Sequence, residues 1–291
     1  MMGLSWLINP IEMLPIPIES LLGILCYCAA GITVGWYLLN VNAKKSKRNA
    51  SKRLAALLGL SGVVFHGVVL ANRLFTASGI NLSFTDALSA AAWLMALLLL
   101  ATSLKEPIEN MGIAVYPFAA ITLGVQNLFP SQHIVIEFGT EANMVKPLEI
   151  HILISLVAYS LFALAAVQAI LLAVQNKQLR NKHPGGFIRA LPPLQTMENL
   201  LFQILAVGFV LLSLSLFSGI LFLEDLFAQH LAHKTVFSII AWLVFGILLW
   251  GRWRFGWRGP MAIRWTLSGF FFLMLAYFGS KLVLEIVLQR T

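Results

Sequence analysis

Long runs of hydrophobic residues dominate the chain, and short polar segments separate them. A helix that crosses the hydrocarbon core of a bilayer needs about 20 mostly apolar residues. Eight runs have roughly that length, and they predict transmembrane helices at residues 19–40, 53–74, 84–103, 110–128, 148–174, 197–222, 234–251 and 262–288. We therefore predict an all-α, polytopic membrane bundle that forms a single transmembrane domain over residues 1–291.

The composition also favours a membrane protein. Hydrophobic residues make up 59% of the chain and charged residues 11%, whereas a soluble domain spends about a quarter of its residues on charged types. The formal net charge is +8. Because the basic residues lie in the links between apolar runs, orientation in the membrane explains them, and we expect no nucleic-acid partner.

The basic residues occupy every second link between the predicted helices. They cluster at residues 44–53, 177–189 and 252–264, after the first, fifth and seventh helix. Alternate links lie on the same side of a membrane, and the positive-inside rule assigns that side to the cytoplasm. The sequence therefore predicts that both termini lie on the non-cytoplasmic side.

Three histidines lie inside predicted helices or at their ends. His66 lies in the second helix, about eight residues or about 12 Å from its outer end, and His151 and His233 lie near the outer ends of the fifth and seventh. Ionisable side chains within a membrane span usually face the bundle interior, and neutral imidazole is a good iron ligand. One interpretation is a haem site in the outer half of the bundle. The other is three separate histidines, each hydrogen-bonded to its own neighbours.

Two basic residues are candidates for neutralising the propionates of a haem. Arg73 follows His66 by seven residues, which places both on one helix face. Lys281 lies in the predicted eighth helix, four residues before Glu285. Alternatively, Arg73 extends to the membrane interface and Lys281 pairs with Glu285. The chain has no phosphate-binding loop, acid pair or Ser-His-Asp pattern, so we do not expect an enzyme.

Several segments resemble a known family. The segment HKTVFSIIAWLVFGILLWGRWRFGWRGPMAIRWTLSGF at 233–270 is similar to the C-terminal part of cytochrome c assembly membrane proteins (CcsA/CcmC/HemX-like), in which a GWRG turn precedes a final helix. LPPLQTMENLLFQILAVGFVLLSLSLFSG at 191–219 and YFGSKLVLE at 277–285 resemble the YpjD/HemX-type branch. The resemblance covers residues from about 60 to 288. It implies a multi-pass protein of the bacterial inner membrane that handles haem at its outer face.

The resemblance also bears on the histidines. The family's external histidine at the start of a span matches His151, and its transmembrane histidine in the second span matches His66. The haem-handling branch has a tryptophan-rich WGxxWxWD loop, whereas this chain has FLEDLFAQHLAHKT at 222–235, without tryptophan. The second external histidine after the last span is also missing. We therefore expect that the chain is not the haem ligase, and we infer that His233 replaces the lost ligand.

Our leading hypothesis is a membrane protein that holds one haem b in the outer half of the bundle, with His151 and His233 as axial ligands of the iron and His66 as the alternate ligand. The predicted site consists of His66, His151, His233, Arg73 and Lys281. The expected role is haem transport, storage or sensing in cytochrome c biogenesis, with membrane lipid, haem and other biogenesis or haem-synthesis proteins as partners. Two alternatives stay open: a transporter of a small solute or cation, and a non-catalytic scaffold that regulates haem synthesis.

Overall fold

The computed structural model describes residues 16–40, 45–76, 79–104, 106, 108–130, 134–137, 142–182, 185–222 and 232–279. Within these residues the α-helices are α1 (Ile18–Leu39), α2 (Lys45–Leu74), α3 (Phe84–Ser103), α4 (Gly112–Leu128), α5 (Ala142–Arg180), α6 (Gly186–Ala190), α7 (Leu194–Phe222), α8 (Ala232–Phe255) and α9 (Pro260–Met274). A 3₁₀ turn at Glu109–Met111 precedes α4, and a π turn at Leu275–Gly279 follows α9. Two short strands, β1 (Gly79–Asn81) and β2 (Ile134–Glu137), pair antiparallel.

Seven helices among the described residues are long and apolar enough to cross a membrane: α1 to α5, α7 and α8. This confirms the prediction of an all-α, polytopic bundle. The predicted eighth span at 262–288 corresponds to α9 and its π turn, and its last residues lie outside the described part of the chain. Two helices begin well before the predicted spans, α2 at Lys45 and α5 at Ala142. Hydropathy marks the part of a helix that lies in lipid, and these helices continue beyond it.

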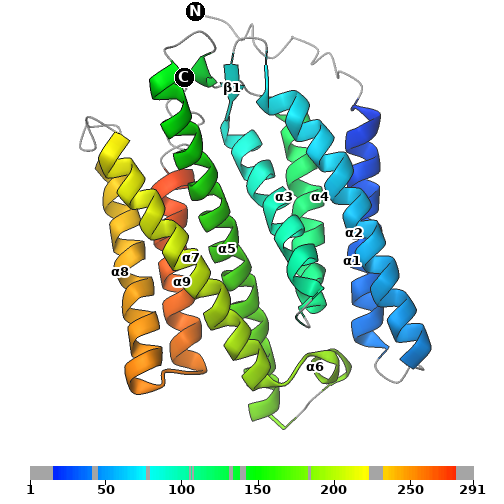
Figure 1. The fold of residues 1–291 in the computed structure, drawn as a ribbon. Coiled ribbons are helices and arrows are strands. Elements are labelled where there is room, and N and C mark those ends of the chain that lie inside the picture. The colour runs from blue at the N-terminus through cyan, green and yellow to red at the C-terminus, as the bar shows by residue number, and fades with distance from the viewer. Residues whose placement is uncertain are drawn as a thin grey trace, which may run out of the picture.

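The bundle has two chemically different ends (Figure 1). One end carries the β1–β2 pair, and we call it the hairpin end. At the opposite end the chain connects the end of α1 to the start of α2, the end of α5 to the start of α7 and the end of α8 to the start of α9. Basic residues occupy the last turns of α5 and α8 there, so we call it the basic end.

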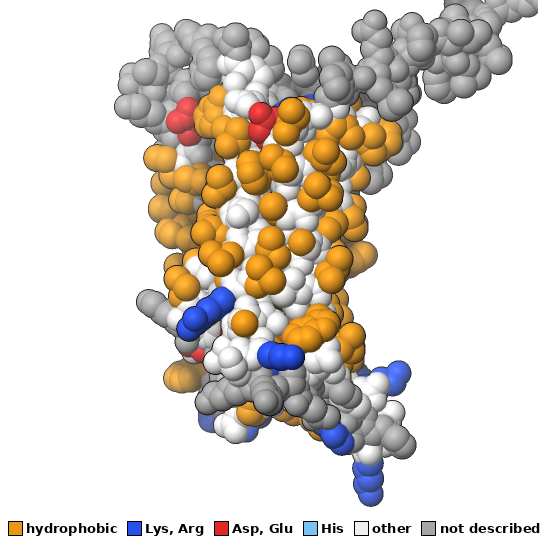
Figure 2. Space-filling view, turned by 90° about the vertical axis from the view of Figure 1, so that its right-hand side faces the viewer, with side chains coloured by type: hydrophobic (Ala, Val, Ile, Leu, Met, Phe, Trp, Pro, Cys, Tyr) orange, Lys and Arg blue, Asp and Glu red, His pale blue; other side chains and the backbone are white. Residues whose placement is uncertain are grey.

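Figure 2 shows the same division on one face of the molecule, where hydrophobic side chains cover the middle and Lys and Arg side chains gather toward the basic end. The three basic links thus share one end, as predicted. The side of the membrane that this end faces stays a prediction, and so do the positions of the termini.

The helices pack as two groups. α1 packs against α2 and α4, and α3 closes this N-terminal half by packing against α2 and α4. In the C-terminal half α5 packs against α7 and α9, and α8 against α7 and α9. The contact between α3 and α5 joins the two halves. The extension of a single domain over all residues 1–291 stays a prediction.

Glycines let aromatic rings fill the space between helices in both halves. A Cβ atom on Gly62 of α2 would lie 2.7 Å from the Tyr27 ring, and one on Gly269 of α9 would lie 2.7 Å from the Phe245 ring. Phe245 in turn stacks on Phe162 of α5, with ring centroids 3.9 Å apart. Small residues at such positions are typical of membrane helix contacts, because they allow close approach without a hydrophobic driving force.

Candidate functional site

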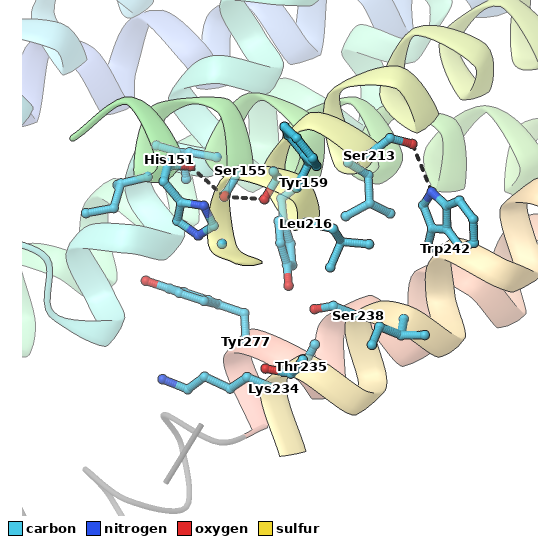
Figure 3. Close-up of a pocket in the computed structure, with 18 of the residues that line it drawn as sticks. His151, Ser155, Tyr159, Ser213, Leu216, Lys234, Thr235, Ser238, Trp242 and Tyr277 are labelled. Carbon is cyan, nitrogen blue, oxygen red and sulfur yellow. Dashed lines mark hydrogen bonds between the residues drawn. The ribbon is translucent and has the colours of Figure 1, made fainter. Parts of the chain in front are cut away.

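A cavity of about 530 Å³ lies between α5, α7, α8 and the π turn that follows α9, in the half of the bundle toward the hairpin end (Figure 3). Its volume falls within the range of about 300–1,000 Å³ that is typical of small-molecule sites. Leucine, isoleucine and aromatic side chains form most of its walls, including Leu212, Leu216 and Trp242. Such a cavity, apolar with a few polar groups, is suited to a large and mainly hydrophobic ligand.

Among the residues that the structure describes, His151 is the histidine that lines this cavity. Its Nδ1 lies 2.8 Å from Oγ of Ser218 on α7. The Ser218 hydroxyl donates its one hydrogen to the carbonyl oxygen of Ser215, at 2.9 Å, so it accepts a hydrogen from Nδ1 of His151. Nε2 is therefore the unprotonated nitrogen of the neutral ring, and it is the nitrogen that can bind a metal.

Two further hydroxyls hold the backbone around His151 against α7. Ser155 Oγ donates to the carbonyl oxygen of His151 at 2.6 Å. Because that hydrogen is used, Ser155 accepts from Ser215 Oγ, 2.7 Å away. With Ser218, these residues form a closed set of hydrogen bonds between α5 and α7. The set fixes both the ring and the backbone of His151 at the cavity wall.

Three polar residues of α5 lie on one face of the helix. His151, Ser155 and Tyr159 all line the cavity, as expected for residues four apart on a helix. The Tyr159 ring makes an edge contact with Tyr277, with centroids 5.8 Å apart. In Figure 3 the Tyr159 hydroxyl points across the cavity toward Ser238 of α8.

The wall opposite His151 carries a basic residue, Lys234, in the first turn of α8. Figure 3 shows Lys234, Thr235 and Tyr277 across the cavity from His151. His233 directly precedes Lys234 in α8, but the described residues do not include its side chain. The prediction that His233 is an iron ligand therefore stays a prediction.

The other predicted site residues are not brought together with His151. His66 is fully buried in the N-terminal half and is not among the residues that line the cavity. Its Nδ1 lies 3.3 Å from the Tyr27 hydroxyl and its Nε2 2.8 Å from Ser89 Oγ. Arg73 donates to Asn127 Oδ1 of α4, at 3.5 Å, and does not line the cavity either. Lys281, together with its predicted partner four residues later, lies outside the described residues.

Reasoning from the sequence missed the residues that other helices contribute to this site. Ser215 and Ser218 are polar positions in the mainly apolar sequence LLSLSLFSG of α7. Serines in such an apolar segment were the one sequence feature that could have indicated these residues. Lys234 is the first residue of the predicted seventh span, and the sequence alone does not show which way it faces. Its position in the first turn of α8, on the cavity side, is a tertiary feature.

The family model for cytochrome c assembly proteins matches residues 54–288. The chain belongs to the cytochrome c assembly protein family. It is 30% identical over 273 residues to the inner membrane protein YpjD of Escherichia coli, an alignment that covers 93% of this chain and 99% of YpjD. This membership and the seven apolar helices make the chain a multi-pass protein of the bacterial inner membrane, with a role related to cytochrome c biogenesis.

Two further relatives match over shorter segments. The cytochrome c biogenesis protein CcsA of Gloeothece citriformis is 26% identical over 113 residues, which are 38% of this chain and 34% of that protein. Protein HemX of Brevibacillus brevis is 22% identical over 131 residues, which are 44% of this chain and 48% of that protein.

Proposed function

We propose that this protein binds one haem b in the cavity between α5, α7, α8 and the π turn after α9, and holds it or passes it on during cytochrome c biogenesis. The observation that carries the proposal is His151, which lines the cavity and has its Nδ1 hydrogen-bonded to Ser218. Metal-ligating histidines use the same arrangement, in which a partner on one ring nitrogen fixes the orientation and tautomer for binding through the other.

The other groups of the cavity also fit a haem. The apolar walls suit the porphyrin ring, and a cation suits its carboxylates. Lys234 supplies that cation on the wall opposite His151. When bound, haem supplies an iron that accepts one or two axial ligands. The protein's part is to bind, orient and shield it, and we propose no catalytic step by the chain itself.

His233 is our proposed second axial ligand, because it precedes Lys234 and Thr235, which both line the cavity. His66 fits this role less well. Both of its ring nitrogens have hydrogen-bonding partners in the N-terminal half, and these contacts would have to break before either nitrogen could bind iron. We therefore propose the pair of His151 and His233, and we assign His66 to a separate network.

Single alanine substitutions at the three histidines test this assignment. Each variant is purified in mild detergent from haem-replete cells, and its haem content is measured against the wild type. We expect His151→Ala to lose most of its haem, His233→Ala to change the absorption spectrum, and His66→Ala to retain the haem. Unchanged haem content and spectra in both His151→Ala and His233→Ala would refute the proposed pair, and haem loss only in His66→Ala would move the site to the N-terminal half.

A further inference from the structure

The turn between α8 and α9 is a well-defined part of the molecule that the proposed haem site does not use. It contains the GWRG segment, Gly256 to Gly259, and lies at the basic end of the bundle (Figure 1). None of its four residues lines the cavity that contains His151. Any binding role of this turn must therefore come from its surroundings at the basic end.

α8 ends in a Schellman motif, in which two backbone hydrogen bonds reach back into the last turn of the helix. Gly256 N–H donates to the Arg252 carbonyl oxygen at 3.1 Å, and Trp257 N–H donates to the Gly251 carbonyl oxygen at 3.3 Å. Gly256 has a φ angle of +67°, which glycine adopts without strain. The Trp257 ring packs on Gly251, where a Cβ atom would clash with it. The path of the chain after α8 is fixed by these contacts.

Side chains of α7 and α8 hold the same turn in place. Glu198 of α7 is 6% exposed, and its Oε1 accepts from the Gly259 N–H at 2.8 Å. Arg252 of α8 donates to the Trp257 carbonyl oxygen at 3.2 Å and to Asn199 Oδ1 of α7 at 3.2 Å. Arg252 is thus part of the internal structure, and the turn is tied to α7 before any partner binds.

Two other arginines at this turn are exposed, Arg254 in the last turn of α8 and Arg258 within the GWRG segment. Among the residues that the structure describes, the ion pair joins Lys52 and Glu109, so neither of these two guanidinium groups has a carboxylate partner there. Guanidinium matches the geometry of phosphate and binds it through parallel hydrogen bonds. Both side chains can therefore bind an anionic group without breaking an ion pair.

Arg254 also ends a stripe of exposed side chains along α8. Leu243, Ile247 and Trp250 precede it at intervals of four, three and four residues, which places all four residues on one helix face. The three apolar side chains are exposed by 48%, 41% and 54% in that order. The stripe thus changes from aliphatic to aromatic to basic toward the basic end. A phospholipid presents the matching layers of acyl chain, interface and phosphate.

The length of this stripe also matches a phospholipid. From Leu243 to Arg254 the helix rises about 16 Å, at about 1.5 Å per residue. One leaflet contributes about 15 Å to the hydrocarbon core of a bilayer. α8 is one of the helices that are apolar enough to cross a membrane, so Leu243 and Ile247 lie at a depth that a soluble partner does not reach. A lipid contacts these residues and Arg254 at the same time.

We propose that this face of α8 and the following turn bind one anionic phospholipid. Arg254 and Arg258 bind its phosphate, Trp250 lies beside its glycerol, and an acyl chain packs along Ile247 and Leu243. The negative headgroup is selected because these exposed arginines lie at an end of the molecule that is rich in basic residues. Bound lipid fixes the depth of α8 in the leaflet, and the proposal does not depend on haem binding.

Native mass spectrometry of the full-length protein in mild detergent tests this proposal. The protein is titrated with phosphatidylglycerol and, separately, with phosphatidylcholine that has the same acyl chains. We expect the wild type to bind the first phosphatidylglycerol more tightly. Arg254→Gln and Arg258→Gln should each weaken this binding about five-fold, the usual contribution of a basic residue near an anionic lipid. Phosphatidylcholine binding should stay the same, and inorganic phosphate should not compete.

The matched control is the double variant Lys177→Gln and Arg180→Gln, which removes two exposed basic residues from the last turn of α5 at the same end. It should bind phosphatidylglycerol as the wild type does, whereas the double variant at Arg254 and Arg258 should not. Equal losses in the two double variants would overturn the proposal, because binding would then follow net charge alone.

A measurement on the wild type needs no variant. Phosphatidylglycerol should raise the temperature of thermal unfolding in detergent more than phosphatidylcholine does. Equal effects and equal affinities of the two lipids would overturn the proposal. So would unchanged phosphatidylglycerol binding in the double variant at Arg254 and Arg258, and these arginines would then be available to a soluble acidic partner.

Discussion

Replacing Ser218 with alanine removes the partner of His151 Nδ1 and leaves the cavity walls in place. The hydroxyl lies 2.8 Å from the ring nitrogen and has its own hydrogen committed to the carbonyl oxygen of Ser215. In Ser218→Ala the ring N–H loses this acceptor inside the bundle, at a cost of about 1–3 kcal/mol. The ring then rotates or changes tautomer, and Nε2 is no longer held as the unprotonated nitrogen.

The expected consequence is a weaker haem site. Loss of a hydrogen-bond partner behind a metal-ligating histidine typically lowers affinity by about 10- to 100-fold, which corresponds to about 1.4–2.8 kcal/mol. This agrees in size with the cost of an unsatisfied buried donor. Titration of haem-free protein with hemin, followed by visible absorbance, measures the dissociation constant directly. Ser218→Thr keeps the hydroxyl and should bind hemin nearly as the wild type does.

Ser213→Ala is the matched control, because Ser213 is a serine of the same helix that lines the same cavity. Its hydroxyl accepts from Trp242 Nε1 at 2.8 Å and donates to the Phe209 carbonyl oxygen, with no contact to His151. We expect its hemin affinity to match the wild type. Equal affinities in Ser218→Ala and Ser213→Ala would refute the reasoning that Ser218 prepares His151 for iron binding.

Two further predictions concern stability. Gly269→Ala would place a Cβ atom 2.7 Å from the buried Phe245 ring, so thermal unfolding in detergent should show that the free energy of unfolding falls by about 1–3 kcal/mol. The control is Gly35→Ala, where an added Cβ atom has no neighbour within 4 Å, and it should show no loss of stability. Equal losses in the two variants would contradict the packing described. Glu109→Gln removes a partly exposed ion pair with Lys52, so in the same assay the free energy of unfolding should fall by at most about 1 kcal/mol. A much larger fall would contradict this reasoning and would mean that the pair is essential to the structure of the basic end.

The sequence was a good guide to the membrane helices and a poor guide to their ends. An apolar run of about 20 residues is a strong signal, because the bilayer sets its length. The first residues of α2, Lys45 to Lys52, are mostly polar and still helical, since a helix need not stop where the lipid ends. The β1–β2 pair was not predicted, because strands of three and four residues carry too little periodicity to be recognised.

For the candidate site, the sequence predicted how far along each helix a residue lies but not which helices lie next to one another. The intervals of four residues between His151, Ser155 and Tyr159 place them on one helix face, and all three line the cavity. His66 was expected near His151 because both lie toward the same end of the bundle. The structure places them in different halves, since α2 packs against α3 and α3 lies against α5. Which helices are adjacent is decided by packing, and a single sequence does not reveal it.

The visible spectrum of the purified wild-type protein, recorded oxidised and reduced, tests the central claim most directly. The account predicts close to one haem per chain, sharp α and β bands on reduction as expected for two histidine ligands, and loss of most of this haem in His151→Ala. A colourless protein that also fails to bind added hemin would contradict the claim, and so would a full haem complement in His151→Ala.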